Sequence, residues 1–219
     1  MPKKNIRMVA GRPLIVHAIE CARRCPSLDR VVVSTDSEEI ATIARQYGAE
    51  VPFMRPVELA SDTAAMVPVL EHAISEIEKK TAERVEFLVL IDATAPLRIA
   101  DDIEQALKIC RADDCDAVIS ASEAHRNPYF NMVKEENGYM RLVIEPDKPV
   151  VRRQDAPKVY DVNTVVWVWR RNALMEDHAR IPKRTKLYLV PRERSIDLDS
   201  ESDFNLLEYF IQRKQGITA

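Results

Sequence analysis

Short apolar runs alternate with helical repeats over the first 121 residues of the chain. Residues 87–91 read Phe-Leu-Val-Leu-Ile, an apolar run without polar alternation that is too short for most helices. This pattern predicts a strand that is covered on both faces and lies in the middle of a parallel sheet. Further strands are predicted at 30–36 and 116–121, and a weaker one at 50–54.

Amphipathic helices are predicted between these strands. Apolar residues recur at helical spacing after Pro13, after Ser37, after Thr63 and after the acidic pair Asp101 and Asp102. Alternation of strand and helix predicts an α/β fold with a Rossmann-like, doubly wound and mostly parallel sheet. We expect a single domain that spans residues 1–219.

The pattern changes between residues 127 and 163, where prolines divide the chain into short pieces. Asn137-Gly138 is a strong hairpin signal between apolar runs at 130–133 and 139–144. This predicts a small antiparallel excursion inserted into the domain. Strands at 164–169 and 185–190, a short helix at 171–176 and a helix through Phe204, Leu207 and Phe210 complete the prediction.

Composition narrows the class of protein. The net charge is -3 and no basic block is present, which argues against a nucleic-acid binder. No apolar run approaches membrane length, and the two lysines near the N-terminus precede no apolar signal region. The four cysteines lack paired spacing, so we expect reduced thiols in a cytoplasmic protein, with a zinc site as the less favoured alternative.

Polar residues follow the 87–91 strand directly. Asp92, Thr94 and Arg98 lie where ligands collect in open α/β sheets, outside the carboxyl end of a strand. The alternative is that Asp92 only caps a turn.

The segment Ser195-Ile-Asp-Leu-Asp199 carries the most specific small pattern. In an extended segment Asp197 and Asp199 face the same side, and paired carboxylates suit Mg²⁺ with phosphate oxygens completing its coordination. The alternative is that Asp199 or Ser200 caps the last helix, with Asp203 completing a capping box.

A second candidate is the segment that begins Val151-Arg152-Arg153-Gln154. Adjacent arginines here do not fit an amphipathic face, and guanidinium groups bind carboxylates in a fork, which indicates an anionic substrate. A solvated salt-bridge loop at a subunit contact explains the same residues equally well.

Five segments together resemble the acylneuraminate cytidylyltransferases, which make CMP-activated sialic acids and related nonulosonic acids. In this family's order the chain carries Lys4-Asn5-Ile6 with Gly11-Arg-Pro-Leu14, Arg55-Pro-Val-Glu-Leu-Ala-Ser-Asp-Thr63, Asp92-Ala-Thr-Ala-Pro-Leu-Arg98, Arg153-Gln-Asp-Ala-Pro157 and Ser195-Ile-Asp-Leu-Asp199. The resemblance covers nearly the whole chain and is greatest to the bacterial branch that acts on sialic, legionaminic or pseudaminic acid.

The resemblance implies a role for each matching residue. It implies catalytic roles for Lys4, Asp197 and Asp199, the last two as ligands of Mg²⁺. Implied nucleotide contacts are Lys4, Asn5, Arg55, Ser61, Asp62 and Thr63, and implied sugar contacts are Asp92, Thr94, Arg152, Arg153, Gln154, Tyr160 and Asn163. It also implies a homodimer in which the 127–163 excursion brings residues such as Arg153, Gln154 or Tyr160 near the partner's site.

Several positions depart from the family pattern. Relatives begin with an apolar strand and a glycine-rich phosphate loop ahead of the Lys4-Asn5 match, and this sequence begins at Met1-Pro2. We therefore expect an open edge beside residues 87–91. Asp92 replaces a glutamine of many relatives, Thr164 a glycine and Trp167 a tyrosine, so the identity of the sugar stays open.

The function implied is transfer of CMP from CTP to the anomeric hydroxyl of a nine-carbon 2-keto sugar acid, with release of pyrophosphate. No nucleic acid or membrane partner is expected. Two alternatives remain: a catalytically impaired homologue or truncated subunit that binds nucleotide or sugar without turnover, and a cytidylyltransferase for the eight-carbon acid Kdo.

Overall fold

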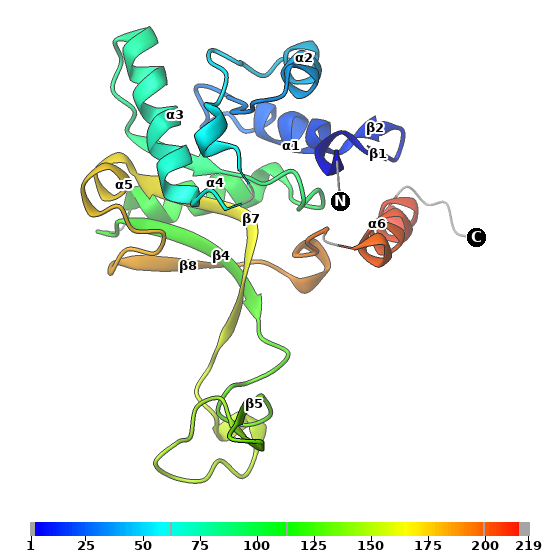
Figure 1. Ribbon diagram of the computed structural model, residues 1–219, viewed down its shortest axis with the longest axis vertical. Helices are drawn as coiled ribbons and strands as arrows, with labels where there is room; N and C mark the ends of the chain where they lie inside the picture. The colour runs from blue at the N-terminus through cyan, green and yellow to red at the C-terminus, as the bar shows by residue number, and fades with distance from the viewer. Residues whose placement is uncertain (1–2, 62, 113, 199, 215–219) are drawn as a thin grey trace.

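The computed structural model describes residues 3–61, 63–112, 114–198 and 200–214. Its main sheet has four strands in the order β3-β7-β4-β8, shown in Figure 1. These strands are β3 (Phe87–Leu90), β4 (Ala117–Glu123), β7 (Tyr160–Arg170) and β8 (Thr185–Leu189). The sheet is mixed: β4 and β8 pair in parallel, and β7 pairs antiparallel with both β3 and β4.

Helices cover both faces of the sheet because successive residues of its strands point to opposite faces. Val118, Val166 and Val168 pack against the first and fourth helices, whereas Ile119, Trp167 and Trp169 pack against the third and fifth. The helices are α1 (Leu14–Arg23), α2 (Glu38–Gln46), α3 (Met66–Thr81), α4 (Ala100–Ala112), α5 (Arg171–Asp177) and α6 (Glu201–Lys214). The predicted α/β class with helices on two faces is confirmed.

Local sequence explains several helix ends. The Ser37 hydroxyl accepts a hydrogen bond from the Ile40 amide at the start of α2. At the start of α6 the Ser200 amide donates to the Asp203 carboxylate, and the Asp203 amide donates to the Ser200 hydroxyl. The predicted capping box is therefore present, formed by Ser200 and Asp203.

Strand β3 lies at one edge of the sheet in the described part of the chain. Its neighbour is the antiparallel strand β7, so the prediction that residues 87–91 lie in the middle of a parallel sheet is wrong. The expectation of an open edge at this strand is confirmed. An apolar run reports how the faces of a strand are covered, and it carries no signal of whether both edges are paired.

The predicted strands at 30–36 and 50–54 do not form as strands. One parallel bridge joins Val32 to Glu50, with the Glu50 amide donating to the Val31 carbonyl at 2.7 Å and the Val33 amide donating to the Glu50 carbonyl at 2.9 Å. Pro52 has no amide hydrogen to extend this pairing. The two stretches thus lie side by side without a regular ladder.

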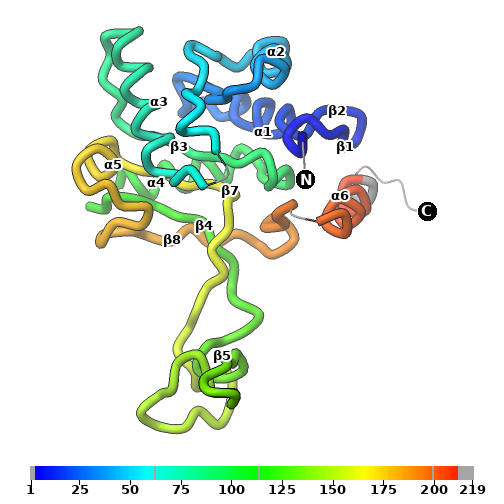
Figure 2. Tube along the Cα trace, viewed as in Figure 1, coloured from blue at the N-terminus to red at the C-terminus, as the bar shows by residue number. Residues whose placement is uncertain are grey.

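An arm projects from the carboxyl end of β4 and the beginning of β7, as Figures 1 and 2 show. It contains a hairpin of β5 (Val133–Glu136) and β6 (Tyr139–Leu142), joined by Asn137 and Gly138 with φ angles of 53° and 81°. Positive φ at both central residues is the geometry that Asn-Gly favours. The predicted antiparallel excursion is confirmed, although β5 begins at Val133 and not at Phe130.

The remaining elements are short, and those near the N-terminus lie against the C-terminal helix. They are η1 (Lys4–Ile6), β1 (Met8–Val9), β2 (Arg12–Pro13), η2 (Val57–Leu59), η3 (Arg153–Asp155) and η4 (Arg192–Arg194). Val9 and Leu14 pack with Leu198, Phe204 and Leu207 in one buried cluster, so the N-terminal turn lies against the beginning of α6. No helix among the described residues is long and apolar enough to cross a membrane.

The packing of α3 on the sheet gives a direct test of this core. Ile74 is 1% exposed among residues of α5, β4 and β7. Changing Ile74→Ala should lower the free energy of unfolding by about 2–5 kcal/mol in urea denaturation, because a buried cavity is left. The control Val57→Ala removes methyl groups from a side chain that is 79% exposed and should change stability by less than about 0.5 kcal/mol. Equal effects of the two changes would contradict the assigned core.

Candidate functional site

The carboxyl end of β3 carries the first part of the site. The Asp92 amide donates to the Thr164 carbonyl at 3.4 Å, which ties the turn after β3 to strand β7. Burial raises the pKa of the Asp92 carboxyl above its ordinary value, the nearby Arg98 charge opposes this rise, and the charge of Asp197 adds to it. Asp92 is therefore a half-buried acid, and the charges that act on it, Arg98, Asp197, Lys4 and Arg180, come from four separate segments.

Arg98 holds the turn that presents Asp92. Its side chain is 5% exposed, Nε donates to the Val165 carbonyl at 2.7 Å, and Nη2 donates to the Thr164 and Asp92 carbonyls. Burial lowers the pKa of Arg98 to about 10, so the guanidinium stays charged at neutral pH. Nη1 is buried without a hydrogen-bond partner among residues described by the structure. Arg98 thus holds the backbone carbonyls of Asp92, Thr164 and Val165 in place, and its Nη1 group makes no hydrogen bond to the described residues.

Asp197 meets this turn from the other end of the chain. The Leu198 amide donates to the Thr94 carbonyl at 3.1 Å, and Lys4 Nζ donates to the Leu198 carbonyl at 2.7 Å. Oδ1 of Asp197 is buried and has no hydrogen-bond partner within the described ranges. A buried, unpartnered carboxylate oxygen is costly unless a cation or donor completes it. Lys4, Thr94 and Asp197, which the sequence places in three different segments, are brought together here.

The N-terminal turn is held in place by a second contact with α6. Arg7 donates to both carboxylate oxygens of Glu201 at 2.5 and 2.7 Å, and its guanidinium lies 4.0 Å from the centre of the Phe204 ring. Lys4 and the exposed Asn5 belong to the η1 turn just before Arg7. The turn is therefore fixed beside the segment that carries Asp197.

Strand β7 adds buried polar atoms next to Asp92. The Asn163 side-chain oxygen accepts a hydrogen bond from the Ser120 hydroxyl at 2.6 Å, and the Asn163 carbonyl accepts one from the Trp167 ring nitrogen at 2.6 Å. Nδ2 of Asn163 and Oγ1 of Thr164 are buried without partners in the part of the chain that is described. These atoms are available to a polar ligand at the end of the sheet.

The oxygen ligands available at this place suit a hard cation such as Mg²⁺. No cluster of three or more His, Cys, Asp or Glu residues able to hold a metal occurs within the described residues. Mg²⁺, however, usually takes only one or two protein carboxylates and fills its other positions with water and phosphate oxygens. The unpartnered Oδ1 of Asp197 is an oxygen ligand of this kind. Asp199, the other predicted ligand, lies outside the described residues.

The predicted nucleotide contacts of the second motif lie on a different loop. Arg55 Nε donates to the Ser34 hydroxyl at 3.1 Å and Nη2 donates to the Ser34 carbonyl, and burial lowers the pKa of this guanidinium. The hydroxyls of Ser61 and Thr63 lie 3.3 Å apart. Asp62 lies outside the described residues. Arg55 thus anchors its loop to the end of the 30–36 segment, and its described contacts do not reach Asp92 or Asp197.

The arginines predicted to bind the sugar lie on the arm. Arg152 forms a two-point ion pair with Asp155 at 2.9 and 3.1 Å, and Arg153 donates to the carbonyls of His125 and Ala124. Gln154 is exposed, and Tyr160 starts strand β7 at the base of the arm. In Figure 1 the arm points away from the sheet and its helices. Within one chain, these four residues are not brought together with Asp92, Thr94 and Asp197.

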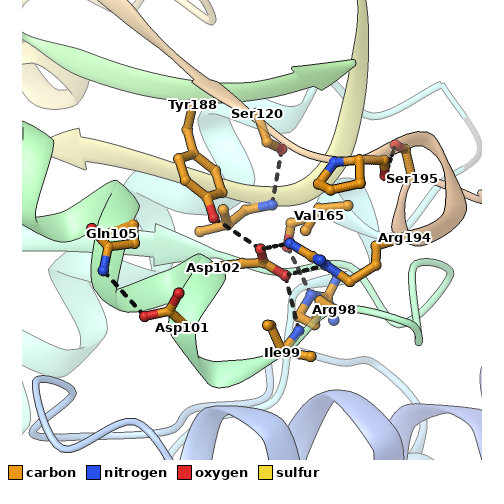
Figure 3. Close-up of polar contacts among 12 residues, drawn as sticks. Arg98, Ile99, Asp101, Asp102, Gln105, Ser120, Val165, Tyr188, Arg194 and Ser195 are labelled. Atoms are coloured by element: carbon orange, nitrogen blue, oxygen red, sulfur yellow. Dashed lines mark hydrogen bonds and ion pairs between the residues drawn. The ribbon is translucent and has the colours of Figure 1, made fainter. Parts of the chain in front are cut away.

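Sequence reasoning missed two features of the site. Arg180 lies with its guanidinium 4.9 Å from the centre of the Trp167 ring, and its charge opposes the rise in the pKa of Asp92 that burial causes. Asp102 was predicted only to open a helix, yet it also binds Tyr188 and Arg194, as Figure 3 shows. Asp102 and Arg194 are 92 positions apart, so no local pattern in the sequence signals their contact.

Comparisons with known proteins show the family to which the chain belongs. A family model described as "Cytidylyltransferase" matches residues 1–215. The chain is 37% identical over 211 residues to the CMP-N,N'-diacetyllegionaminic acid synthase of Campylobacter jejuni, a match that spans 96% of this chain and 89% of that protein. It is equally similar, with the same coverage, to the post-translational flagellin modification protein B of Campylobacter coli.

A solved structure supports the fold. The structure of CMP:2-keto-3-deoxy-manno-octonic acid synthetase complexed with CTP superposes with a TM-score of 0.68 at 15% identity, over 98% of this chain and 93% of that one. This likeness shows a shared fold. With the family match over nearly the whole length and the 37% identical relatives, it follows that this chain belongs to the cytidylyltransferase family.

Proposed function

We propose that this chain transfers CMP from CTP to the anomeric hydroxyl of a nonulosonic acid and releases pyrophosphate. The observation that supports this most is the meeting of Lys4, Asp92 and Asp197 at the carboxyl end of β3, with Oδ1 of Asp197 buried and unpartnered in the described structure. A relative named for CMP-N,N'-diacetyllegionaminic acid, 37% identical, favours an acid of the legionaminic type as the acceptor.

The residues divide into three proposed roles. Lys4 and Asn5 of the η1 turn, with Arg55, Ser61, Asp62 and Thr63 of the second loop, contact the nucleotide. Asp92, Thr94 and Asn163 contact the sugar. Asp197 and Asp199 hold Mg²⁺, which when bound offsets the negative charge of the triphosphate.

The chemistry asks mainly for positioning and charge neutralisation. The sugar hydroxyl oxygen forms a bond to the α-phosphorus of CTP and gives its proton to water, while the bond from that phosphorus to the bridging oxygen breaks and pyrophosphate leaves. Lys4 lies close enough to Asp197 for its ammonium to offset charge on the phosphates, since its Nζ contacts the next residue along the chain. No described residue is required to serve as the general base.

We further propose that the arm completes the site of a second copy of this chain in a homodimer. The hairpin and the loop after it expose several large apolar side chains, with Tyr139 73% and Met140 64% exposed. Exposed apolar surface of this kind is typical of interfaces. A partner's arm would bring Arg152, Arg153, Gln154 and Tyr160 to a site that they do not reach in their own chain.

We place the reaction in the cytoplasm, in line with the four free cysteines.

The role of Asp197 can be tested by removing its charge. Asp197→Asn should leave the unfolding temperature close to that of the unchanged chain and reduce pyrophosphate release by at least about 100-fold, the scale seen when a preorganised electrostatic group is lost. Asp177→Asn, an exposed position at the end of α5, is the control and should retain turnover. Unchanged turnover in Asp197→Asn would rule out the proposed metal ligand.

The raised pKa of Asp92 predicts that the stability difference between the unchanged chain and an Asp92→Asn variant depends on pH. Because the pKa of Asp92 is raised on folding, the folded state binds this proton more tightly than the unfolded state. The stability associated with the protonated form is present below the unfolded pKa of about 3.9 and is lost as the pH rises through the folded pKa. Asp92→Asn should therefore have a higher melting temperature than the unchanged chain at pH 7, and the difference should disappear towards pH 4. Melting curves that stay parallel across this pH range would contradict the assignment.

The arm can be tested through the oligomeric state. Replacing Tyr139 and Met140 together by lysine should weaken self-association at least about tenfold, because two apolar side chains that the proposed interface would bury become charged. Sedimentation velocity would measure association, and turnover should fall as the dimer is lost. Val57→Lys, at an exposed apolar residue outside the arm, should change neither quantity. A double variant that stays dimeric with full turnover would contradict the proposed arm exchange.

A further inference from the structure

An ion pair between a fully buried carboxylate and a partly buried guanidinium adjoins the turn that carries the site. The Asp102 side chain is 0% exposed, and its two oxygens accept four hydrogen bonds, as Figure 3 shows. The donors are the Ile99 amide at 2.9 Å, the Tyr188 hydroxyl at 2.9 Å, and Arg194 Nη2 and Nε at 2.7 and 3.3 Å. The carboxylate is therefore fully surrounded by donors from three separate elements.

These contacts connect the two segments that carry the acidic residues of the site. Asp102 lies in the first turn of α4, directly after the 92–99 turn, and its bond to the Ile99 amide fixes the end of that turn. Arg194 is the last residue of η4 and stands three positions before Asp197. One carboxylate thus holds the turn of Asp92 on one side and the segment of Asp197 on the other.

The segment that carries Asp197 is short and is fixed at both ends. Upstream, Arg194 is held by Asp102, and downstream the Leu198 amide is held by the Thr94 carbonyl. Only Ser195, Ile196 and Asp197 lie between these two points. With at most about 3.6 Å of chain per residue, the backbone at Asp197 has little freedom while both ends stay in place.

Helix capping alone does not account for the arginine. The Ile99 amide already gives Asp102 the capping bond that the start of α4 needs. Burying a guanidinium and a carboxylate together contributes little net stability, because desolvation offsets their attraction. An ion pair in this place is better explained by the geometry that it imposes on its neighbours.

We infer that Asp102 and Arg194 are positioning residues that hold the Asp197 carboxylate at a fixed separation from Asp92, in the geometry that binds Mg²⁺ with CTP. This inference rests on the proposed function. The metal probe is Mn²⁺, whose binding in the presence of CTP is followed by water-proton relaxation, without any need for turnover. The variants are Asp102→Asn and Arg194→Lys, which keeps the charge but loses the fork.

The chain offers a matched control. Arg171 donates to both oxygens of Glu78 at 2.7 and 2.9 Å, a two-point pair between α3 and α5 on the other face of the sheet. Glu78→Gln breaks this pair as Asp102→Asn breaks the other. It should lower the melting temperature and leave Mn²⁺ affinity unchanged.

Asp102→Asn and Arg194→Lys should each weaken Mn²⁺ binding by about 10–100-fold, the range found when groups that orient metal ligands are removed. The Mg²⁺ concentration for half-maximal turnover should rise by the same factor. If folded Asp102→Asn or Arg194→Lys binds Mn²⁺ as Glu78→Gln does, the pair is structural only and the inference is wrong. If Asp102→Asn does not fold, Arg194→Lys decides alone. If the unchanged chain itself fails to bind Mn²⁺ with CTP, the proposed metal site fails and the inference fails with it.

Discussion

The site depends on holding two carboxylates near each other although the charge of Asp197 disfavours ionisation of Asp92. Left to themselves, such groups separate, take up a proton or bind a cation. Here the backbone prevents separation, because the Leu198 amide is bonded to the Thr94 carbonyl. Arg98 and Lys4 supply positive charge beside the pair, and they also donate to the Asp92 and Leu198 carbonyls, respectively. The same contacts that oppose repulsion therefore shape the site.

The fold could be predicted from the sequence where hydrophobic period and turn chemistry decide the structure. The 116–121 strand, the Asn137-Gly138 hairpin and the helix after Asp101 form as expected. The prediction failed where edges decide the outcome. Residues 30–36 have the composition of a strand but make a single bridge, and β3 lies at an edge beside an antiparallel neighbour. Composition reports the burial of faces and says little about hydrogen-bonding partners.

The site was predictable only where a local pattern marked it. Asp92 at the end of a strand and the Asp-X-Asp segment at 197–199 are visible in the sequence, and the structure brings Asp92 and Asp197 together. The pairing of Asp102 with Arg194 joins residues 92 positions apart and leaves no local pattern. The arginines at 152 and 153 show the opposite case, since their pattern indicates an anion site while their own chain holds them on the arm. In the proposed homodimer, the arm of a second copy would bring these arginines to the site and so account for both their pattern and their position.

The central claim is CMP transfer to a nonulosonic acid, and pyrophosphate release tests it most directly. The unchanged chain would be incubated with CTP and Mg²⁺ and, in separate reactions, with N,N'-diacetyllegionaminic, N-acetylneuraminic and pseudaminic acids and with Kdo. The account predicts release that requires both CTP and sugar and is greatest with a nine-carbon acid. Folded protein that binds CTP but releases no pyrophosphate with any of the four acids, or releases it only with Kdo, would contradict the account.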